Sequence, residues 1–252
     1  QDDLPINFKV SVEELCKLID KTKFAISMEE TRYYLNGIYI HKHDKKLIAV
    51  ATDGHRLART SINLPSGADL ISGVIIPRKA IYEIRKLIED YSYDEEVSIS
   101  LSDSKIRVNI SNTIITSKLI DGNFPDYEKV IPKDNANIVN LDCLVFSESV
   151  DRVSTIFSDK SKSVRLSLST NKLSLEANSP DTGSASEEIE ITYDKDDISI
   201  GFNSRYLLDV TSQIGSGDLI MALKDSGSPA LISLPNDSES LFVLMPMRVW
   251  YF

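Results

Sequence analysis

The sequence contains few of the residues from which catalytic and metal sites are usually built. Three histidines and two cysteines occur in 252 residues. Cys16 and Cys143 each stand alone in an apolar-periodic segment, with no second Cys or His at ligand spacing. The motifs G-x-S-x-G, H-E-x-x-H and C-x-x-C and the phosphate-binding loop are also missing. We therefore expect no catalytic residues, no metal, no cofactor and no disulfide framework.

Long apolar runs are missing as well. Nothing approaches the roughly 18 consecutive apolar residues of a membrane span, and the opening QDDLPINFKV lacks the basic and apolar regions of a signal peptide. With 42% hydrophobic residues the chain is long enough for one large domain or two smaller ones. These features predict a globular cytoplasmic protein without a membrane partner. The net charge of −10 argues against nucleic acid, because phosphate binding depends on Lys and Arg.

The apolar pattern indicates an α+β fold that repeats once. A helix is predicted from Val12, after a capping Ser11 with Glu14 three residues on. Further helical patterns cover 77–90, 143–157 and 204–214, and alternating runs between them predict strands. Ile81, Ile84 and Ile88 match Leu207, Val210 and Ile214 at one constant offset of 126 residues. Two similar domains are therefore predicted, 1–132 and 133–252.

Two stretches are candidates for chemistry or recognition. VATDGHRLA, residues 50–58, brings Asp53, His55 and Arg56 together, which could serve a hydrolase. Asp followed by Gly is equally typical of a tight turn. The end of the chain, SLFVLMPMRVWYF, suits either a core strand or an adaptable peptide-binding surface, because Met repacks easily and Pro interrupts regular pairing. The acidic run SEEIEITYDKDD is expected to be a solvated strand face.

Six motifs occur in one order along nearly the whole chain. They are RYYLNG (32–37), ATDGHRLA (51–58), PRKAI (77–81), TSKLIDGNFPDYEKVIP (116–132), IGFNSRYLLDV (200–210) and MPMR (245–248). Together they resemble the bacterial sliding clamp family, the beta subunits of DNA polymerase III. The resemblance implies two tandem DNA-clamp domains of processivity fold, each with two helices on antiparallel sheets. They match the family's middle and C-terminal domains, and the family's N-terminal domain is expected to be absent.

The resemblance implies a non-catalytic function. Two full-length subunits would join head to tail as a homodimeric ring around double-stranded DNA, without sequence specificity, in the nucleoid of a bacterial cytoplasm. A ring that slides can hold a polymerase at its template by raising its effective concentration. The expected partners are the alpha subunit of DNA polymerase III, the clamp loader, other polymerases, mismatch-repair proteins and ligase. The predicted helices that would line the ring, counted over 12–23, 77–90, 146–157 and 204–214, sum to zero charge, which reconciles the acidic chain with loosely held DNA.

The resemblance also implies site residues. Partner proteins would insert short motifs with Leu and Phe anchors and a Gln into an apolar groove between the domains. The residues that match this groove are Leu35, Thr52, Gly54, His55, Arg56, Leu57, Pro125, Lys129, Val130, Tyr206, Pro229, Val243, Leu244, Met245, Pro246, Met247 and Arg248. Lys129, Pro229 and Gly227 depart from residues found in other members, so peptide preference is expected to differ in detail.

For DNA, the resemblance indicates Arg32, Tyr33 and Tyr34. Helix position and charge add six cations, namely Lys17, Lys21, Lys79, Arg85, Arg152 and Arg205. For each of these six a solvated helix face is an equally good interpretation. Two other functions stay open at this point: a hydrolase that uses His55 with Asp53, and a peptide-binding module that never touches DNA. The tail Trp250, Tyr251 and Phe252 extends beyond the family's usual end, close to the groove.

Overall fold

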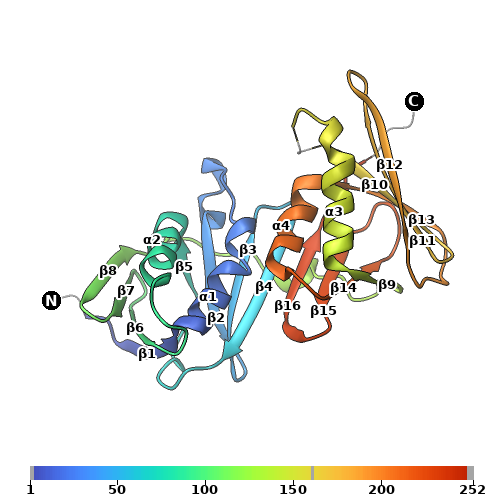
Figure 1. Ribbon diagram of the computed structural model, residues 1–252. Coiled ribbons are helices and arrows are strands. Elements are labelled where there is room, and N and C mark those ends of the chain that lie inside the picture. The colour runs from blue at the N-terminus through green and yellow to red at the C-terminus, as the bar shows by residue number, and fades with distance from the viewer. Residues whose placement is uncertain (1–2, 160–161, 249–252) are drawn as a thin grey trace. The chain divides into compact units, whose positions relative to one another are not determined.

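The computed structural model describes residues 3–159 and 162–248 (Figure 1). Contacts divide the chain into two compact units, Gln1–Tyr127 and Glu128–Phe252. This division lies a few residues before the domain boundary expected between 132 and 133. The tail Trp250 to Phe252 lies outside the described residues.

Between residues 3 and 127 the first unit has the order strand, helix, four strands, helix, three strands (Figure 1). The bounds are β1 (Ile6–Ser11), α1 (Val12–Asp20), η1 (Lys23–Ala25), η2 (Glu30–Leu35), β2 (Gly37–His43), β3 (Lys46–Thr52), β4 (Arg56–Asn63), β5 (Val74–Pro77), α2 (Arg78–Ile88), β6 (Glu96–Leu101), β7 (Lys105–Ile110) and β8 (Thr113–Lys118). The η elements are 3-10 helices. Strands β1-β6-β7-β8 are antiparallel neighbours in that order, as are β5-β2-β3-β4.

Local sequence explains where the first helix begins. The Ser11 hydroxyl accepts a hydrogen bond from the Glu14 amide at 3.0 Å, and the Glu14 carboxylate accepts one from the Ser11 amide at 3.0 Å. This reciprocal pair satisfies two amides that the first helical turn leaves unpaired. The predicted start at Val12 is therefore confirmed. The helix ends at Asp20, and a separate 3-10 turn follows.

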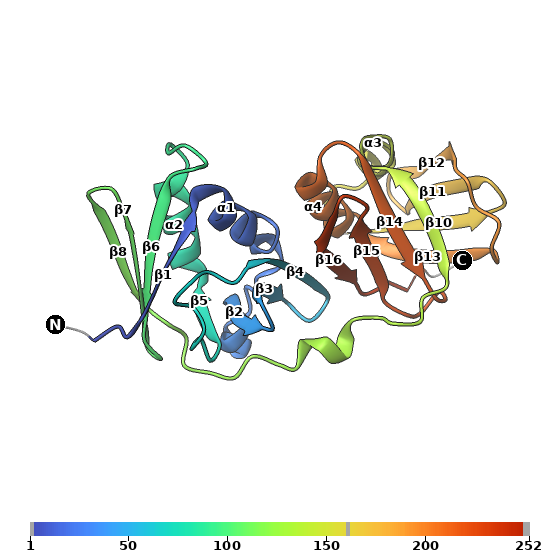
Figure 2. The ribbon, with the colours of Figure 1, turned by 90° about the horizontal axis from the view of Figure 1, so that it is seen from below.

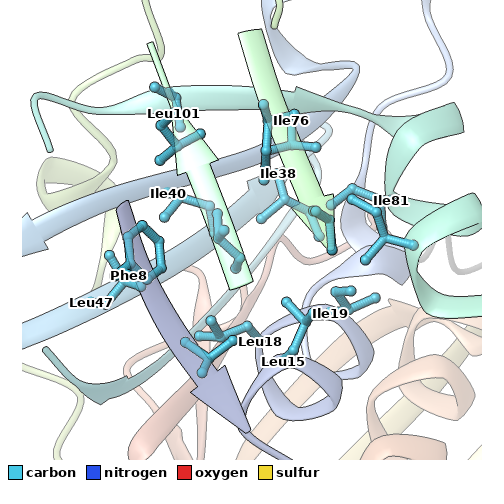
Figure 3. A pocket seen from close by; sticks show the side chains of 16 residues that line it. Phe8, Leu15, Leu18, Ile19, Ile38, Ile40, Leu47, Ile76, Ile81 and Leu101 are labelled. Atoms are coloured by element: carbon cyan, nitrogen blue, oxygen red, sulfur yellow. The ribbon is translucent and has the colours of Figure 1, made fainter. Parts of the chain in front are cut away.

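The core of the first unit lies between its strands and its helices. Figure 3 shows side chains from both sets converging, among them Phe8, Leu18, Ile38, Ile81 and Leu101. They enclose an entirely apolar cavity of about 40 Å³. Burial of aliphatic side chains from both helices and most of the strands is the main force holding the unit together.

The second unit repeats the same order over residues 128–159 and 162–248. Its elements are η3 (Tyr127–Val130), which begins at the boundary, β9 (Asn137–Asp142), α3 (Cys143–Val153), η4 (Ser154–Ile156), β10 (Ser163–Ser169), β11 (Lys172–Ser179), β12 (Gly183–Glu190), β13 (Ile198–Asn203), α4 (Ser204–Ile214), β14 (Asp218–Leu223), β15 (Ala230–Leu234) and β16 (Asp237–Leu244). Strands β9-β14-β15-β16 and β13-β10-β11-β12 form the two antiparallel sets. Figure 2 shows α3 and α4 beside these strands.

Side-chain caps also begin the helices of the second unit. The Asp142 carboxylate accepts from the Val145 amide at 3.0 Å, and the Asn203 side chain accepts from the Arg205 amide at 2.9 Å. Helix α3 therefore starts at Cys143, where the predicted pattern 143–157 starts, and ends at Val153, before the end of that pattern. Both units place two helices on antiparallel strands, so the predicted α+β class is confirmed. None of the helices in the described ranges is long and apolar enough to cross a bilayer.

Candidate functional site

The turn between β3 and β4 is fixed by its own side chains. The Asp53 carboxylate accepts from the amides of His55 at 2.9 Å and Arg56 at 3.1 Å. The Thr52 hydroxyl donates to the Arg56 carbonyl at 2.6 Å, and Gly54 adopts a φ of 87°, which favours glycine. The Asp53 carboxylate thus shapes the backbone, and in the described part of the chain it makes no hydrogen bond to the His55 ring. His55 is exposed at the tip of the turn.

Two arginines hold this turn from different directions. Arg56 Nε donates to the Asp53 carboxylate at 3.1 Å, with only 11% and 16% of the two side chains exposed. The Arg56 guanidinium also lies 5.4 Å from the ring centre of Phe24, a cation–π contact. Arg32 Nη2 donates to the Asp53 carbonyl at 2.9 Å, and its Nε donates to Glu29 at 3.0 Å. The turn is therefore bound to both 3-10 segments that precede β2.

The ion pair between Arg32 and Glu29 affects the titration of both groups. The hydrogen bond from Arg32 lowers the pKa of Glu29, and the same bond raises the pKa of Arg32. Both shifts favour the charged pair at neutral pH. Phe24 and Glu29 were not among the predicted site residues, although the spacing of Glu29 three positions before Arg32 is a recognisable signal for an ion pair.

The remaining candidates of the first unit divide into exposed and buried side chains. Tyr33 is exposed, and its ring meets that of Tyr34 edge to face at 5.7 Å. Leu35 and Leu57 are only 3% and 2% exposed, which makes them members of the core beneath the turn rather than free surface. Thr52 lies between these extremes.

An aromatic cluster fixes the segment that leads out of the first unit. Phe124 stacks on Tyr39 with ring centres 4.7 Å apart, and the Tyr127 hydroxyl lies 2.6 Å from His41 Nε2. Tyr127 is buried, while Pro125 between these anchors is exposed. Lys129 and Val130, which belong to the second unit, are also exposed. In the motif GNFPDY the aromatic residues thus anchor the segment, and the proline stays accessible.

In the second unit, candidate residues gather where β16 ends. Val243 and Leu244 are buried, but Met245 and Met247 are 42% and 38% exposed. The Met247 amide donates to the Gly201 carbonyl at 2.7 Å, which holds the segment after the strand in place. Pro246 and Tyr206 are half-buried, and Arg248 is exposed. The Pro229 carbonyl accepts from Asn135 at 2.9 Å, and Gly227 lies in an exposed turn.

Most of the predicted DNA-contacting cations already have partners within the chain. Arg85 donates twice to Asp20, at 2.8 and 3.1 Å, and Arg152 donates to both oxygens of Glu187, at 2.6 and 3.0 Å. Arg205 lies 3.4 Å from Asp159. Exposed pairs of this kind are weak and can exchange with other anions.

The lysines among these candidates differ in the same respect. Lys17 donates to the Ser61 carbonyl at 3.2 Å, and Lys21 is half-buried. Lys79, on α2, is exposed. The structure therefore places Lys79 and Tyr33 on the surface and gives the three arginines protein partners.

No metal-binding arrangement stands out in residues 3–159 and 162–248, where no group of three or more His, Cys, Asp or Glu side chains is placed to hold an ion. Cys16 and Cys143 are buried and unpaired with each other, and burial raises the pKa of both thiols. The two cysteines are thus core residues.

Comparison with known families gives two adjacent matches. The central domain of the DNA polymerase III beta subunit matches residues 9–126, and the C-terminal domain of that subunit matches residues 128–248. The beta sliding clamp of Caulobacter vibrioides (strain NA1000 / CB15N) is 48% identical over 252 residues, which covers 98% of this chain and 67% of the relative. That of Pseudomonas aeruginosa is 38% identical, over 97% of this chain and 66% of the relative.

Solved structures give the same result. A DnaN sliding clamp (DNA polymerase III subunit beta) from Bartonella birtlesii bound to griselimycin superimposes with a TM-score of 0.95 at 48% identity, over 99% of this chain and 68% of that one. A DNA polymerase sliding clamp from Caulobacter crescentus gives a TM-score of 0.93 at 47% identity, over 99% and 67%. This chain spans about two thirds of the length of these relatives. Sliding clamps are non-catalytic, so the hydrolase alternative built on Asp53 and His55 is wrong. The chain belongs to the beta sliding clamp family of DNA polymerase III and comprises two of its domains, the central and the C-terminal one.

Proposed function

We propose that this chain tethers partner proteins to DNA by binding a short linear peptide of each partner. The residues proposed to bind it are those near the end of β16 in the second unit and those at the β3–β4 turn in the first. The observation that carries the proposal is the Met245-Pro246-Met247 segment, which exposes two thioether side chains while the Met247 amide anchors it to Gly201. Methionine is unbranched and polarisable, so such a surface can repack around different apolar anchors.

The proposed contacts in each unit supply different chemistry. In the first unit the exposed His55 offers polar groups next to Arg56, whose own guanidinium is bound to Asp53. In the second unit the two methionines and the half-buried Tyr206 offer apolar and aromatic surface. A peptide with Leu and Phe anchors and one Gln suits this combination, because its side chains include both apolar and hydrogen-bonding groups. The Bartonella birtlesii clamp was crystallised bound to griselimycin, which supports a ligand site in this family.

DNA is the second proposed partner, encircled by a head-to-tail homodimer of the full-length subunit. With the observed bounds, α1 carries a net charge of −2, α2 of +3, α3 of −1 and α4 of zero, so the four helices are neutral together. The excess acid of the chain therefore lies on strands and loops. Weak, screened contacts with phosphates would allow sliding, whereas dense positive charge would hold the duplex in place.

The same family likeness supports the wider set of partners. We propose that the alpha subunit of DNA polymerase III, other polymerases, the clamp loader, mismatch-repair proteins and ligase use this peptide site in turn. The protein would then act in the cytoplasm at the nucleoid. Competition for one site would order their access to the template.

Calorimetry with a synthetic peptide that carries the Gln, Leu and Phe residues tests the peptide site. Met245→Ala should weaken binding by about 2 kcal/mol, as expected for an anchor contact. Leu144→Ala, which shortens a comparably exposed side chain on α3, is the matched control and should leave the affinity unchanged. Leu57→Ala is a poorer probe, because that side chain is buried and its loss would cost stability. Equal affinities of the Met245 variant and the unmodified chain would remove the site from the β16 end.

A separate experiment tests whether DNA is encircled. The full-length ring should remain on nicked circular DNA and should leave once the circle is linearised. Loss from both forms at the same rate would favour a peptide-binding module that does not encircle DNA.

A further inference from the structure

We propose that Arg32 is a positioning residue of the peptide site, which holds the β3–β4 turn in place, rather than a contact to DNA. The inference rests on the proposed peptide-binding function and deepens it. It replaces the expectation, based on resemblance, that Arg32 acts together with Tyr33 and Tyr34 on the duplex.

The Arg32 guanidinium is hydrogen-bonded to two groups of the protein. A guanidinium has five donors in a rigid planar fork, so it can join two groups at a defined angle. Arg32 uses Nη2 on the Asp53 carbonyl at 2.9 Å and Nε on the Glu29 carboxylate at 3.0 Å. The side chain is 34% exposed. A phosphate would have to compete with the neighbouring carboxylate for this fork.

Arg32 also packs closely against Gly54. A Cβ built on Gly54 would lie 2.6 Å from Arg32 Nη1 and 3.3 Å from Nη2. The guanidinium therefore lies directly against the glycine of the turn. The φ of 87° at Gly54 shows that the backbone itself takes the left-handed conformation at this contact.

Different hydrogen bonds fix the shape of the turn and its position. Hydrogen bonds to the Asp53 carboxylate set the shape, but both partners, the amides of His55 and Arg56, belong to the turn itself. The bond from Arg32 comes from a residue 21 positions away in η2, and thus it joins the turn to another segment. We therefore expect loss of that bond to displace His55 at the exposed tip.

The backbone of η2 is adapted to this contact. At Arg32 the φ and ψ angles are −109° and 57°, outside helical values, so the 3-10 segment is kinked there. The Arg32 side chain contacts the β3–β4 turn, while Tyr33, the next residue, is exposed and its ring meets that of Tyr34. The structure thus supports different roles for Arg32 and Tyr33 despite their adjacency.

Three variants of the 252-residue chain test the inference. Arg32→Ala should weaken binding of the synthetic Gln, Leu and Phe peptide about tenfold, because the turn is no longer held. Arg32→Lys should recover part of the loss, since an ammonium group can still reach one acceptor but cannot join two. Arg107→Ala, which removes a half-buried arginine on β7, should leave the affinity unchanged.

Hydrogen exchange gives a readout that does not depend on the peptide. In Arg32→Ala the amides of His55 and Arg56 should exchange faster, while those of β7 should keep their rates. If the two amides exchange faster in Arg32→Ala but the unmodified chain binds no peptide, the positioning role is retained and the proposed function is rejected. Unchanged exchange at both amides would overturn the positioning role itself.

DNA binding distinguishes the competing role. If Arg32 contacts phosphate instead, Arg32→Ala should weaken binding to a duplex oligonucleotide and reduce its salt dependence by about one phosphate contact. That result, together with an unchanged peptide affinity, would overturn the inference. A tenfold loss of peptide affinity with an unchanged salt dependence would support it.

Discussion

The two units have the same order of elements and the same strand neighbours, but they differ in the connection between the first helix and the second strand. In the first unit this connection is residues 21–36, and it forms η1 and η2. In the second unit it is residues 154–162, of which 154–159 and 162 are described, and it forms η4. The longer connection contributes Phe24 and Arg32, which contact the β3–β4 turn, and Glu29, which binds Arg32. Extra length in one connection thus supplies contacts to this turn in only one of the two described units.

The matching hairpin of the second unit, β11–β12, has a different character. There a side chain of the turn reaches the connection, since the Thr182 hydroxyl donates to the Ile156 carbonyl. Asp181 is exposed, whereas the Asp53 side chain is largely buried. Strand β3 is buried on both faces, while β12 alternates exposed and half-buried residues. The same topology therefore yields a braced polar turn in one unit and a solvated turn in the other.

The largest effect is expected in the cores, where the two units should not differ. Ile81→Ala and Leu207→Ala remove side chains that are equivalent in the repeat and almost fully buried. Each should lower the free energy of unfolding by about 3 kcal/mol, from lost burial and the cavity left behind. Urea unfolding measures both, with Ile114→Ala on the exposed face of β8 as the control. A loss near zero for either core variant would show that the repeat does not extend to packing.

A smaller effect is expected at the two turns, where the units should differ. Asp53→Ala removes two hydrogen bonds to backbone amides and the ion pair with Arg56, and should cost about 2 kcal/mol of stability. Asp181→Ala alters an exposed turn and should stay within about 0.5 kcal/mol. Thermal unfolding of both variants measures the difference. Similar losses would mean that the second turn is held as firmly as the first.

The smallest effect is a pH dependence that belongs to the second unit. Hydrogen bonds from Arg152, and then from Ser149, lower the pKa of Glu187 in the folded chain. A group with a lowered folded pKa stabilises the fold above its unfolded pKa of about 4.3, and this contribution is lost as the pH falls through the folded pKa. Glu187→Gln should therefore reduce the loss of stability on acidification, by less than about 1 kcal/mol because the pair is partly exposed.

The free energy of unfolding, measured from neutral to acidic pH, tests this expectation for Glu187→Gln. Glu83→Gln, an exposed position on α2, controls for the removal of one negative charge. If Glu187→Gln loses as much stability on acidification as the unmodified chain, solvent screens the interaction completely.

Local signals made much of the fold predictable. The Ser11–Glu14 pair marks the start of α1, and the offset between Ile81 and Leu207 reveals the repeat, because both depend on neighbouring or periodic residues. The helical pattern predicted over 143–157 begins where α3 begins, directly after its N-cap Asp142, but it runs past the end of the helix at Val153. Apolar spacing alone does not separate the last helical turn from the 3-10 turn η4 that follows it.

Contacts between distant residues could not be predicted. Asp20 is 65 positions from Arg85, and Glu187 is 35 positions from Arg152, so helix position alone left these arginines available for DNA. The same limit applies to the burial of Leu57, a predicted groove residue that is only 2% exposed. Alternation in a strand indicates two faces, but it does not indicate whether one of them is covered.

The close contact between Gly54 and the Arg32 guanidinium also constrains how this chain can change over time. Any larger residue at position 54 requires the arginine to withdraw. With a shorter residue at position 32 this steric constraint on position 54 is lost, and only the backbone angle still favours glycine there. We expect these two positions to covary among homologous clamps, with glycine at 54 wherever arginine occupies 32. Substitutions at the two positions would then be correlated, although about 21 residues separate the arginine from the turn that it holds.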